Sequence, residues 1–169
     1  MSGPAAGAER RVLVAGVGNI FLGDDGFGVE VARRLTQGPA TAGVKVADFG
    51  IRGVHLAYEL LDGYDTLVLV DAVSRGDPPG TVSVIEATTG PGDGDGTLAA
   101  MDAHGMDPGA VLAMVADLGG HLDQVLVVGC EPAQVDDGIG LSEIVSAAIP
   151  TAVDAVRDLI ESLVKEATP

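Results

Sequence analysis

Short apolar runs that alternate with segments of helical periodicity are the feature that most constrains this fold. Residues 66–70, TLVLV, form a continuous apolar run rich in β-branched side chains, which is typical of a strand covered on both faces. Residues 27–35 instead carry apolar side chains at helical spacing. Strands that alternate with helices form mainly parallel sheets, so this order predicts an α/β fold.

The same two patterns predict the remaining elements. The predicted strands span residues 11–16, 44–49, 66–70, 81–86 and 124–129, and the predicted helices span 27–35, 55–61, 108–118 and 142–166. The fourth strand follows the third after a loop alone, so we expect it to pair antiparallel or to lie at an edge. We predict one three-layer domain over residues 11–166, with a mainly parallel five-stranded twisted sheet and helices on both faces, after a flexible tail over residues 1–10. Pro150 should bend the last helix near residues 147–150.

The formal net charge of -16 restricts the partners of the chain. With 9 Lys and Arg residues against 25 Asp and Glu residues, the chain would repel nucleic acid and anionic membranes, so we expect neither as a partner. No apolar run reaches the ~20 residues of a membrane span. The single cysteine, Cys130, cannot form an internal disulfide, which favours a reducing compartment and a cytoplasmic location. We interpret Cys130 as a small buried residue at a strand end rather than as a nucleophile.

A glycine-rich loop, GVGNIFLGDDGFG at residues 16–28, follows the first predicted strand. Such a loop invites a dinucleotide-binding interpretation, but Phe21 occupies the position of the third glycine in G-x-G-x-x-G. Asp24 and Asp25 come next, and their carboxylates would repel a pyrophosphate. The loop is better suited to presenting a carboxylate than to binding a nucleotide.

Acidic residues follow three of the predicted strands. Asp24 and Asp25 come after the first strand, Asp48 ends the second, and Asp71 directly follows the third. The carboxyl ends of parallel strands form the ligand crevice of open α/β sheets, so these acids should gather at one edge of the sheet. Asp24 has an alternative role as the cap of the helix at residue 27. Asp71 adjoins a hydrophobic core and therefore needs a partner.

One of the three histidines belongs with these acids. His55 and His121 lie at a helix start and in a turn, where surface or capping roles are expected. His104 lies at the end of a long segment rich in Gly and Asp, residues 88–107, which we interpret as a loop or lid. Together with Asp25 and Asp71, His104 would complete an oxygen–oxygen–nitrogen set suited to a borderline divalent ion with open coordination positions.

Sequence blocks in a fixed order carry a family resemblance. These blocks are GVGN at 16–19 with DDGFG at 24–28, VDA at 70–72 with PG at 79–80, AHGM at 103–106, VGCEP at 128–132 and GIGLS at 138–142. Together they resemble the signature of the nickel–iron hydrogenase maturation endopeptidases. The resemblance covers nearly the whole chain, and the combination of blocks is more specific than any one of them.

The resemblance implies a fold, an activity and a set of site residues. Members have an α/β fold with a five-stranded sheet, and they cut a C-terminal extension from the hydrogenase large-subunit precursor after nickel insertion. By motif, the metal-contacting residues would be Asp25, where the family often has Glu, with Asp71 and His104. Nickel would be supplied by the precursor, and other divalent metals could occupy the site. Asp48 and Asp71 would be the catalytic acids, although FGIRG at 49–53 replaces the commoner Gly-Gly-Thr after the first of them. We expect a monomer.

Two mechanisms and two rival functions remain open at this stage. The metal could serve as a docking point or polarise a carbonyl, and a water could be activated by Asp48 or Asp71 in aspartic-protease fashion. One rival is a receiver-like phosphoacceptor module, with Asp71 as acceptor and magnesium at Asp24 and Asp25. That module needs a lysine after the fifth strand, and the two lysines of the chain lie elsewhere. The other rival is a related α/β peptidase with a different substrate.

Overall fold

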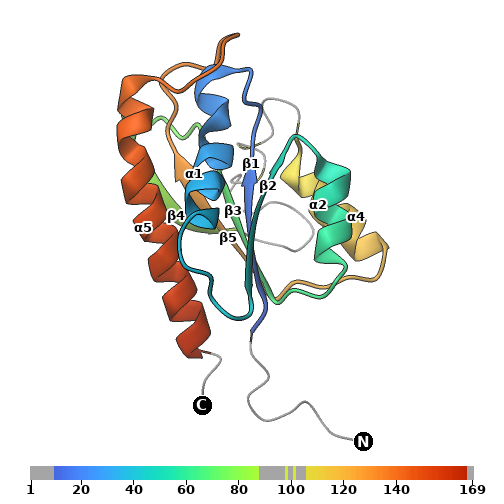
Figure 1. The fold of residues 1–169 in the computed structure, drawn as a ribbon. Coiled ribbons are helices and arrows are strands. Elements are labelled where there is room, and N and C mark those ends of the chain that lie inside the picture. The colour runs from blue at the N-terminus through green and yellow to red at the C-terminus, as the bar shows by residue number, and fades with distance from the viewer. Residues whose placement is uncertain (1–9, 88–97, 99–100, 102–105, 167–169) are drawn as a thin grey trace, which may run out of the picture.

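A five-stranded sheet between two pairs of helices forms the body of the molecule (Figure 1). The structure is a computed structural model that describes residues 10–87, 98, 101 and 106–166. The strands are β1 (Val12–Val17), β2 (Val44–Gly50), β3 (Thr66–Ala72), β4 (Val82–Ala87) and β5 (Gln124–Cys130). The helices are η1 (Gly23–Gly26, a 3-10 helix), α1 (Phe27–Thr36), α2 (Gly53–Leu60), α4 (Pro108–Asp117) and α5 (Glu143–Glu166).

The topology confirms the predicted α/β architecture. The strand order is β2-β1-β3-β5-β4, and β1, β2, β3 and β5 are parallel. β4 pairs antiparallel with β5 at an edge, so both expectations for the fourth strand hold. The predicted ranges of the five strands and four α-helices differ from these elements by no more than two residues at any end, and the short helix η1 lies where a loop was expected.

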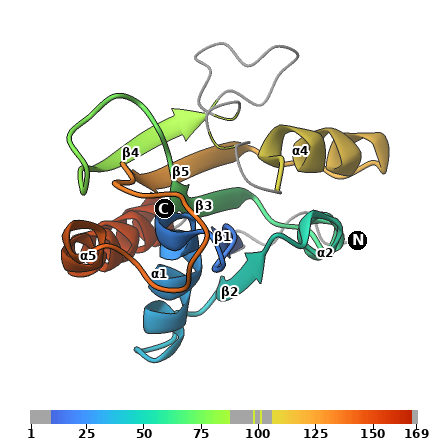
Figure 2. The same cartoon turned by 90° about the horizontal axis from the view of Figure 1, so that it is seen from above.

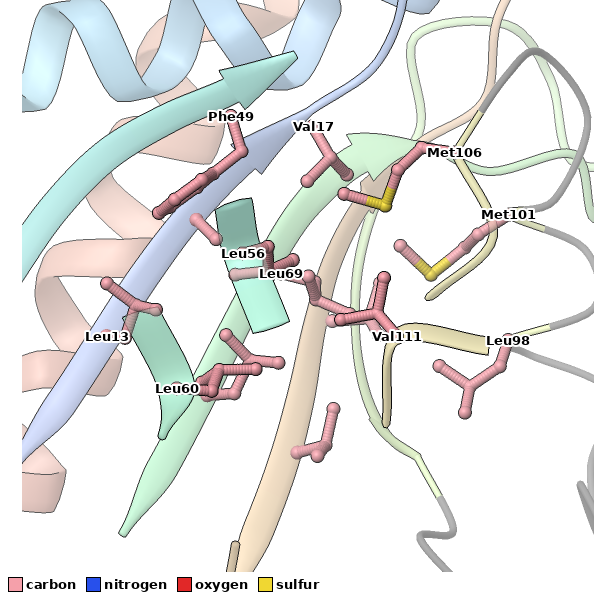
Figure 3. Packing of buried hydrophobic residues seen from close by; sticks show 14 of the residues in the cluster. Leu13, Val17, Phe49, Leu56, Leu60, Leu69, Leu98, Met101, Met106 and Val111 are labelled. Atoms are coloured by element: carbon pink, nitrogen blue, oxygen red, sulfur yellow. The ribbon is translucent and has the colours of Figure 1, made fainter. Parts of the chain in front are cut away.

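Two apolar clusters cover the two faces of the sheet. Side chains alternate along β1, so that Leu13 and Ala15 join the cluster beneath α2 and α4, whereas Val12 and Val14 join the cluster beneath α1 and α5. Figure 3 shows the first cluster, in which aliphatic side chains from the strands meet α2 and α4. Burying each aliphatic side chain contributes roughly 1.5–3 kcal/mol to stability. Both faces of the sheet carry such side chains, so each face must be covered by helices.

The carboxyl ends of β1, β2, β3 and β5 lie at the same edge of the sheet, which Figure 2 shows from above. Three connections that follow β1, β2 and β5 meet there, over residues 18–26, 51–52 and 131–142, and residues 73–81 between β3 and β4 lie at the same edge. The residues between β4 and α4 include 88–97, 99–100 and 102–105, which lie outside the described part of the chain. The flexible-tail prediction for residues 1–10 likewise falls almost entirely outside it.

The last helix is continuous through its proline. α5 runs over 24 residues with Pro150 inside it, so the prediction of one element is confirmed. Proline has no N–H, which leaves the Ser146 carbonyl without its usual amide partner. Ser146 and Pro150 are both exposed, so water can hydrate that carbonyl. The bend near residues 147–150 stays a prediction. Across the described residues, no helix is both long enough and apolar enough to span a membrane.

Candidate active site

Two predicted site residues, Asp25 and Asp71, meet at the carboxyl edge of the sheet. Asp25 lies in η1 and Asp71 near the end of β3, and their side chains are 6% and 4% exposed. Gly18 lies between them with φ of +132°. A Cβ at this position would come within 1.9 Å of the Asp25 carbonyl oxygen and 3.1 Å of Asp71 Oδ1. A glycine is therefore required where the loop after β1 passes between the two acids.

A second glycine brings α1 close to the strand ends. A Cβ on Gly28 would lie 1.9 Å from the Val70 carbonyl oxygen and 2.6 Å from that of Val17. Backbone atoms cannot move aside as a flexible side chain can, so only glycine allows this approach. The close packing sets η1, and with it Asp25, directly above β1 and β3.

Backbone amides hold both carboxylates in place. The Asn19 N–H donates to Asp25 Oδ2 at 2.7 Å, and the Ala72 N–H donates to Asp71 Oδ1 at 2.8 Å. Burial raises the pKa of Asp71 well above its usual range, and the negative charge of Asp25 raises it further, while the Ala72 N–H lowers it. A carboxyl group whose pKa is raised by a second carboxylate is suited to proton transfer during a reaction.

Asp24 joins two loops instead of capping the helix that follows it. Its Oδ2 accepts hydrogen bonds from the Ala133 and Gln134 N–H groups at 2.9 Å each. The Ser142 N–H donates to Asp24 Oδ1 at 2.7 Å, and the Ser142 hydroxyl donates to Oδ2 at 2.9 Å. The interpretation of Asp24 as the cap of the helix at 27 is therefore wrong: Gly26 occupies that position, without a side-chain cap.

Backbone contacts reinforce the link between these loops. The Gly138 N–H donates to the Phe21 carbonyl at 2.9 Å, and the Gly23 N–H donates to the Gly138 carbonyl at 2.9 Å. The Asp24 N–H also donates to the Gln134 carbonyl at 2.8 Å. The loop that carries Asp25 is thus anchored to the connection between β5 and α5.

Glu131 has a structural role that the sequence analysis missed. Its Oε1 accepts hydrogen bonds from the Arg75 N–H at 2.7 Å and the Asp77 N–H at 3.1 Å. Glu131 thereby anchors the loop that leaves β3 just after Asp71. The only signal in the sequence is its place in the VGCEP block, directly after a predicted strand.

Asp48, the other predicted catalytic acid, lies apart from this pair. Its side chain is half exposed, and Oδ1 is 3.6 Å from the Arg52 guanidinium. β1 separates β2 from β3, which places the two strands about 10 Å apart. By strand alternation, Asp48 shares the face of β2 that carries Val44 and Val46, toward α1, whereas Asp71 shares the opposite face of the sheet with Leu69. A catalytic role for Asp48 stays a prediction.

The predicted third metal ligand, His104, lies outside the described residues. Within the part of the chain that the structure describes, there is no group of three His, Cys, Asp or Glu side chains that could hold a metal ion. Asp25 and Asp71 supply two carboxylates, which fit a divalent ion completed by a further ligand. Because burial favours the protonated form of Asp71, metal binding there requires the release of a proton.

Other titratable residues behave as the sequence indicated. His55 is exposed, and His121 is exposed beside Asp123. Cys130 is buried, and its pKa rises to about 11 because of burial, with smaller contributions from Asp24 and Glu131. Burial and a raised pKa keep the thiol protonated, which confirms the structural interpretation of this residue.

The phosphoacceptor alternative needs a lysine beside Asp71. Lys45 pairs with Glu59 at 2.9 Å, near the start of β2, and Lys165 pairs with Glu161 at 3.1 Å, at the end of α5. These are the only two lysines in the sequence, and both lie away from the carboxyl edge. The arrangement therefore does not support a receiver-like site.

A family model described as hydrogenase maturation protease matches residues 29–159. The matched segment includes Asp48, Asp71 and His104 and begins just after Asp25. The hydrogenase expression/formation protein HupD of Thiocapsa roseopersicina is 32% identical over 155 residues, which cover 87% of this chain and 68% of that protein. A putative hydrogenase maturation protease of Methanocaldococcus jannaschii is 30% identical over 152 residues, covering 88% of this chain and 95% of that protein.

Solved structures give the same result. The hydrogenase maturating endopeptidase HybD from E. coli superposes with a TM-score of 0.73 at 29% identity, covering 90% of this chain and 93% of that one. A hydrogenase 2 maturation peptidase from a Thaumarchaeota archaeon superposes with a TM-score of 0.68 at 33% identity, covering 90% of this chain and 99% of that one.

Proposed function

The chain belongs to the hydrogenase maturation protease family, and we propose that it is an endopeptidase that removes the C-terminal extension of a nickel-loaded hydrogenase large-subunit precursor. The observation that carries this proposal is the buried pair Asp25 and Asp71, held by backbone amides at the carboxyl edge of the sheet. That edge is where open α/β sheets bind their ligands.

Recognition of the nickel in the precursor is assigned to Asp25, Asp71 and His104. Two carboxylate oxygens and one imidazole nitrogen suit a borderline divalent ion that already has ligands from another protein. An approaching cation favours the ionised form of Asp71 and so offsets the penalty that burial imposes on its charge. The bond to be cut would then be brought to these acids only when the metal of the precursor is in place.

The cleavage step is assigned to an acid that activates water. Asp71 is the better supported acid, because burial and the neighbouring Asp25 carboxylate raise its pKa well above the usual range of a carboxyl group, as is typical of acids that transfer protons. Asp48 is the second acid in this proposal. Its half-exposed carboxylate beside Arg52 is accessible to a substrate that lies across the edge of β2.

The test compares nickel-loaded and metal-free precursor as substrates, with cleavage followed on gels. The wild-type protein is expected to trim the loaded precursor and to leave the metal-free one uncut. Asp25→Asn, Asp71→Asn and His104→Ala should each lower the rate by about a hundredfold or more, because each removes a group that acts on the substrate. Asp48→Asn measures whether the second acid takes part.

Asp158→Asn, on the exposed surface of α5, serves as the control and should cleave like the wild type. Circular dichroism verifies that every variant is folded. Wild-type rates from folded Asp25→Asn and His104→Ala proteins would refute the site assignment. Equal trimming of loaded and metal-free precursor would refute the nickel checkpoint alone. A wild-type protein that trims neither precursor would contradict the proposed function.

A further inference from the structure

Exposed apolar side chains gather around the acidic pair. Nine large apolar side chains are exposed among the described residues, and five of them belong to the three connections at the carboxyl edge or to the first turn of α2. Phe21 is 60% exposed and Ile139 is 79% exposed. We call this set the apolar rim, and its members are Ile20, Phe21, Ile51, Val54 and Ile139.

Backbone hydrogen bonds hold the apolar rim together. The Gly18 N–H donates to the Gly50 carbonyl at 2.9 Å, which ties the loop of Phe21 to the turn that carries Ile51. The bond from the Gly138 N–H to the Phe21 carbonyl places Ile139 next to the same loop. Exposed apolar side chains on a preorganised backbone lose little conformational entropy on binding, so they favour association with another surface.

Acidic side chains border the rim. Asp136 and Asp137 are exposed just before Ile139, and Asp48 is half exposed three residues before Ile51. Arg52 is the one cation in residues 18–26, 48–54 and 131–142, and its guanidinium donates to the Asp48 and Phe49 carbonyls. Arg75, in the connection after β3, is a second exposed cation at this edge. Acidic residues still outnumber the cations on these connections, which favours a basic partner.

We propose that the apolar rim and its bordering acids dock a segment of the precursor that carries apolar side chains next to basic ones. This proposal rests on the proposed function, and it adds the chemistry of the partner surface. The rim lies at the same edge of the sheet as the buried acids, so a segment docked on it would place the bond to be cut near them. The apolar contacts supply affinity, and the acids supply orientation and a faster encounter.

The apolar part is tested with Phe21→Ser and Ile139→Ser. Each should raise the KM for loaded precursor about tenfold, equivalent to ~1.4 kcal/mol, and leave kcat at saturation unchanged, because the side chains bind without touching the reacting atoms. The matched controls are Leu118→Ser, 56% exposed at the opposite edge of the sheet, and Val84→Ser on β4, which should keep the wild-type KM. Circular dichroism and urea unfolding verify the folds.

The charged part is tested with the double variant Asp136→Asn, Asp137→Asn. The KM of the wild type should rise with salt concentration. The KM of the double variant should be higher at low salt and should change less as salt is added. The control is Asp154→Asn, Asp158→Asn on the exposed surface of α5, which removes the same charge and should keep the salt dependence of the wild type.

Equilibrium binding of the metal-free precursor tests the rim separately from the proposed function. That precursor is expected to remain uncut, so its affinity can be measured without cleavage. Binding about tenfold weaker for Phe21→Ser than for Leu118→Ser supports the rim even if no cleavage is seen. Wild-type binding and wild-type KM for both rim variants, in a preparation that cleaves, would overturn the role of the rim and leave the proposed function standing.

Sedimentation measures whether the protein associates with itself. A wild-type dimer that Phe21→Ser dissociates would make the rim a self-association surface and overturn the proposal.

Discussion

Two adjacent acidic residues have different roles. Asp24 is fully buried and accepts four hydrogen bonds, so its charge is compensated within the protein. Asp25, its neighbour, lies close enough to Asp71 for its charge to raise the pKa of that residue. The difference follows from the tight turn of η1, which directs one carboxylate toward the loop after β5 and the other toward β3.

The raised pKa of Asp71 predicts a pH-dependent stability. The folded state holds this proton more tightly than the unfolded chain, whose Asp pKa is ~3.9. The stability that this proton contributes is complete below the unfolded pKa, and it is lost as the pH rises toward and through the folded pKa. Asp71→Asn has no proton to lose, so it should be more stable than the wild type at neutral pH and lose this advantage near pH ~4.

Urea unfolding of the wild type and Asp71→Asn from about pH 4 to 8 checks this expectation. Asp123→Asn, an exposed acid beside His121, is the control. A stability difference between wild type and Asp71→Asn that stays constant over that range would contradict the assigned cause.

At the scale of elements, the site depends on a junction between connections distant in sequence. Residues 18–26 and residues 131–142 have no regular pairing beyond a single bridge between Leu22 and Gly138. Their junction also includes the start of α5, because Ser142 directly precedes that helix and its N–H donates to Asp24. The position of Asp25 therefore depends on the hydrogen bonds that Asp24 accepts from the connection after β5.

Asp24→Ala should destabilise the protein by on the order of 3 kcal/mol. Four part-buried hydrogen bonds lose their acceptor at once, and each donor left unsatisfied costs about 1–3 kcal/mol. Urea unfolding measures the change, and hydrogen exchange should be accelerated at the Ala133, Gln134 and Ser142 amides. Asp154→Ala, exposed on α5, is the control and should alter neither quantity by much. The same stability for both variants would show that the junction does not depend on this carboxylate.

For the molecule as a whole, the charge and the candidate ligands are compatible with the proposal that this protein meets its metal on a partner. The net charge of -16 favours basic partner surfaces, and two candidate ligands, Asp25 and Asp71, lie in the described part of the chain. The raised pKa of Asp71 means that a cation competes with a proton for this carboxyl group. Two acids of this kind make a docking point more readily than a resident metal centre.

The isolated protein is therefore expected to bind nickel weakly. A ligand at about 100 times its Kd stabilises a protein by ~2.7 kcal/mol, and stoichiometric nickel should give far less. Thermal unfolding with nickel, and again after addition of a chelator, measures this effect, with His104→Ala and Asp25→Asn as comparison variants. A large stabilisation that the chelator reverses and both variants lack would instead indicate a resident metal site.

The sequence by itself determined the elements and their class. Apolar runs and helical periodicities are local properties, so they located the five strands and the four helices α1, α2, α4 and α5 to within two residues, and the strand–helix alternation indicated a mainly parallel sheet. The 3-10 turn η1 has no such pattern and was not predicted. Acids at the ends of strands were visible for the same reason, and Asp25 and Asp71 do meet at the predicted edge.

Only the tertiary structure decided which of these acids act together. The order of the strands placed β1 between Asp48 and Asp71, and alternation along β2 put Asp48 on the α1 face of the sheet. The partners of Asp24 lie 109 to 118 residues further along the chain, beyond the reach of any local pattern. Such contacts depend on which loops the packed core brings together. The local sequence around a carboxylate at the end of a strand does not reveal whether that carboxylate caps a helix, joins two loops or faces a substrate.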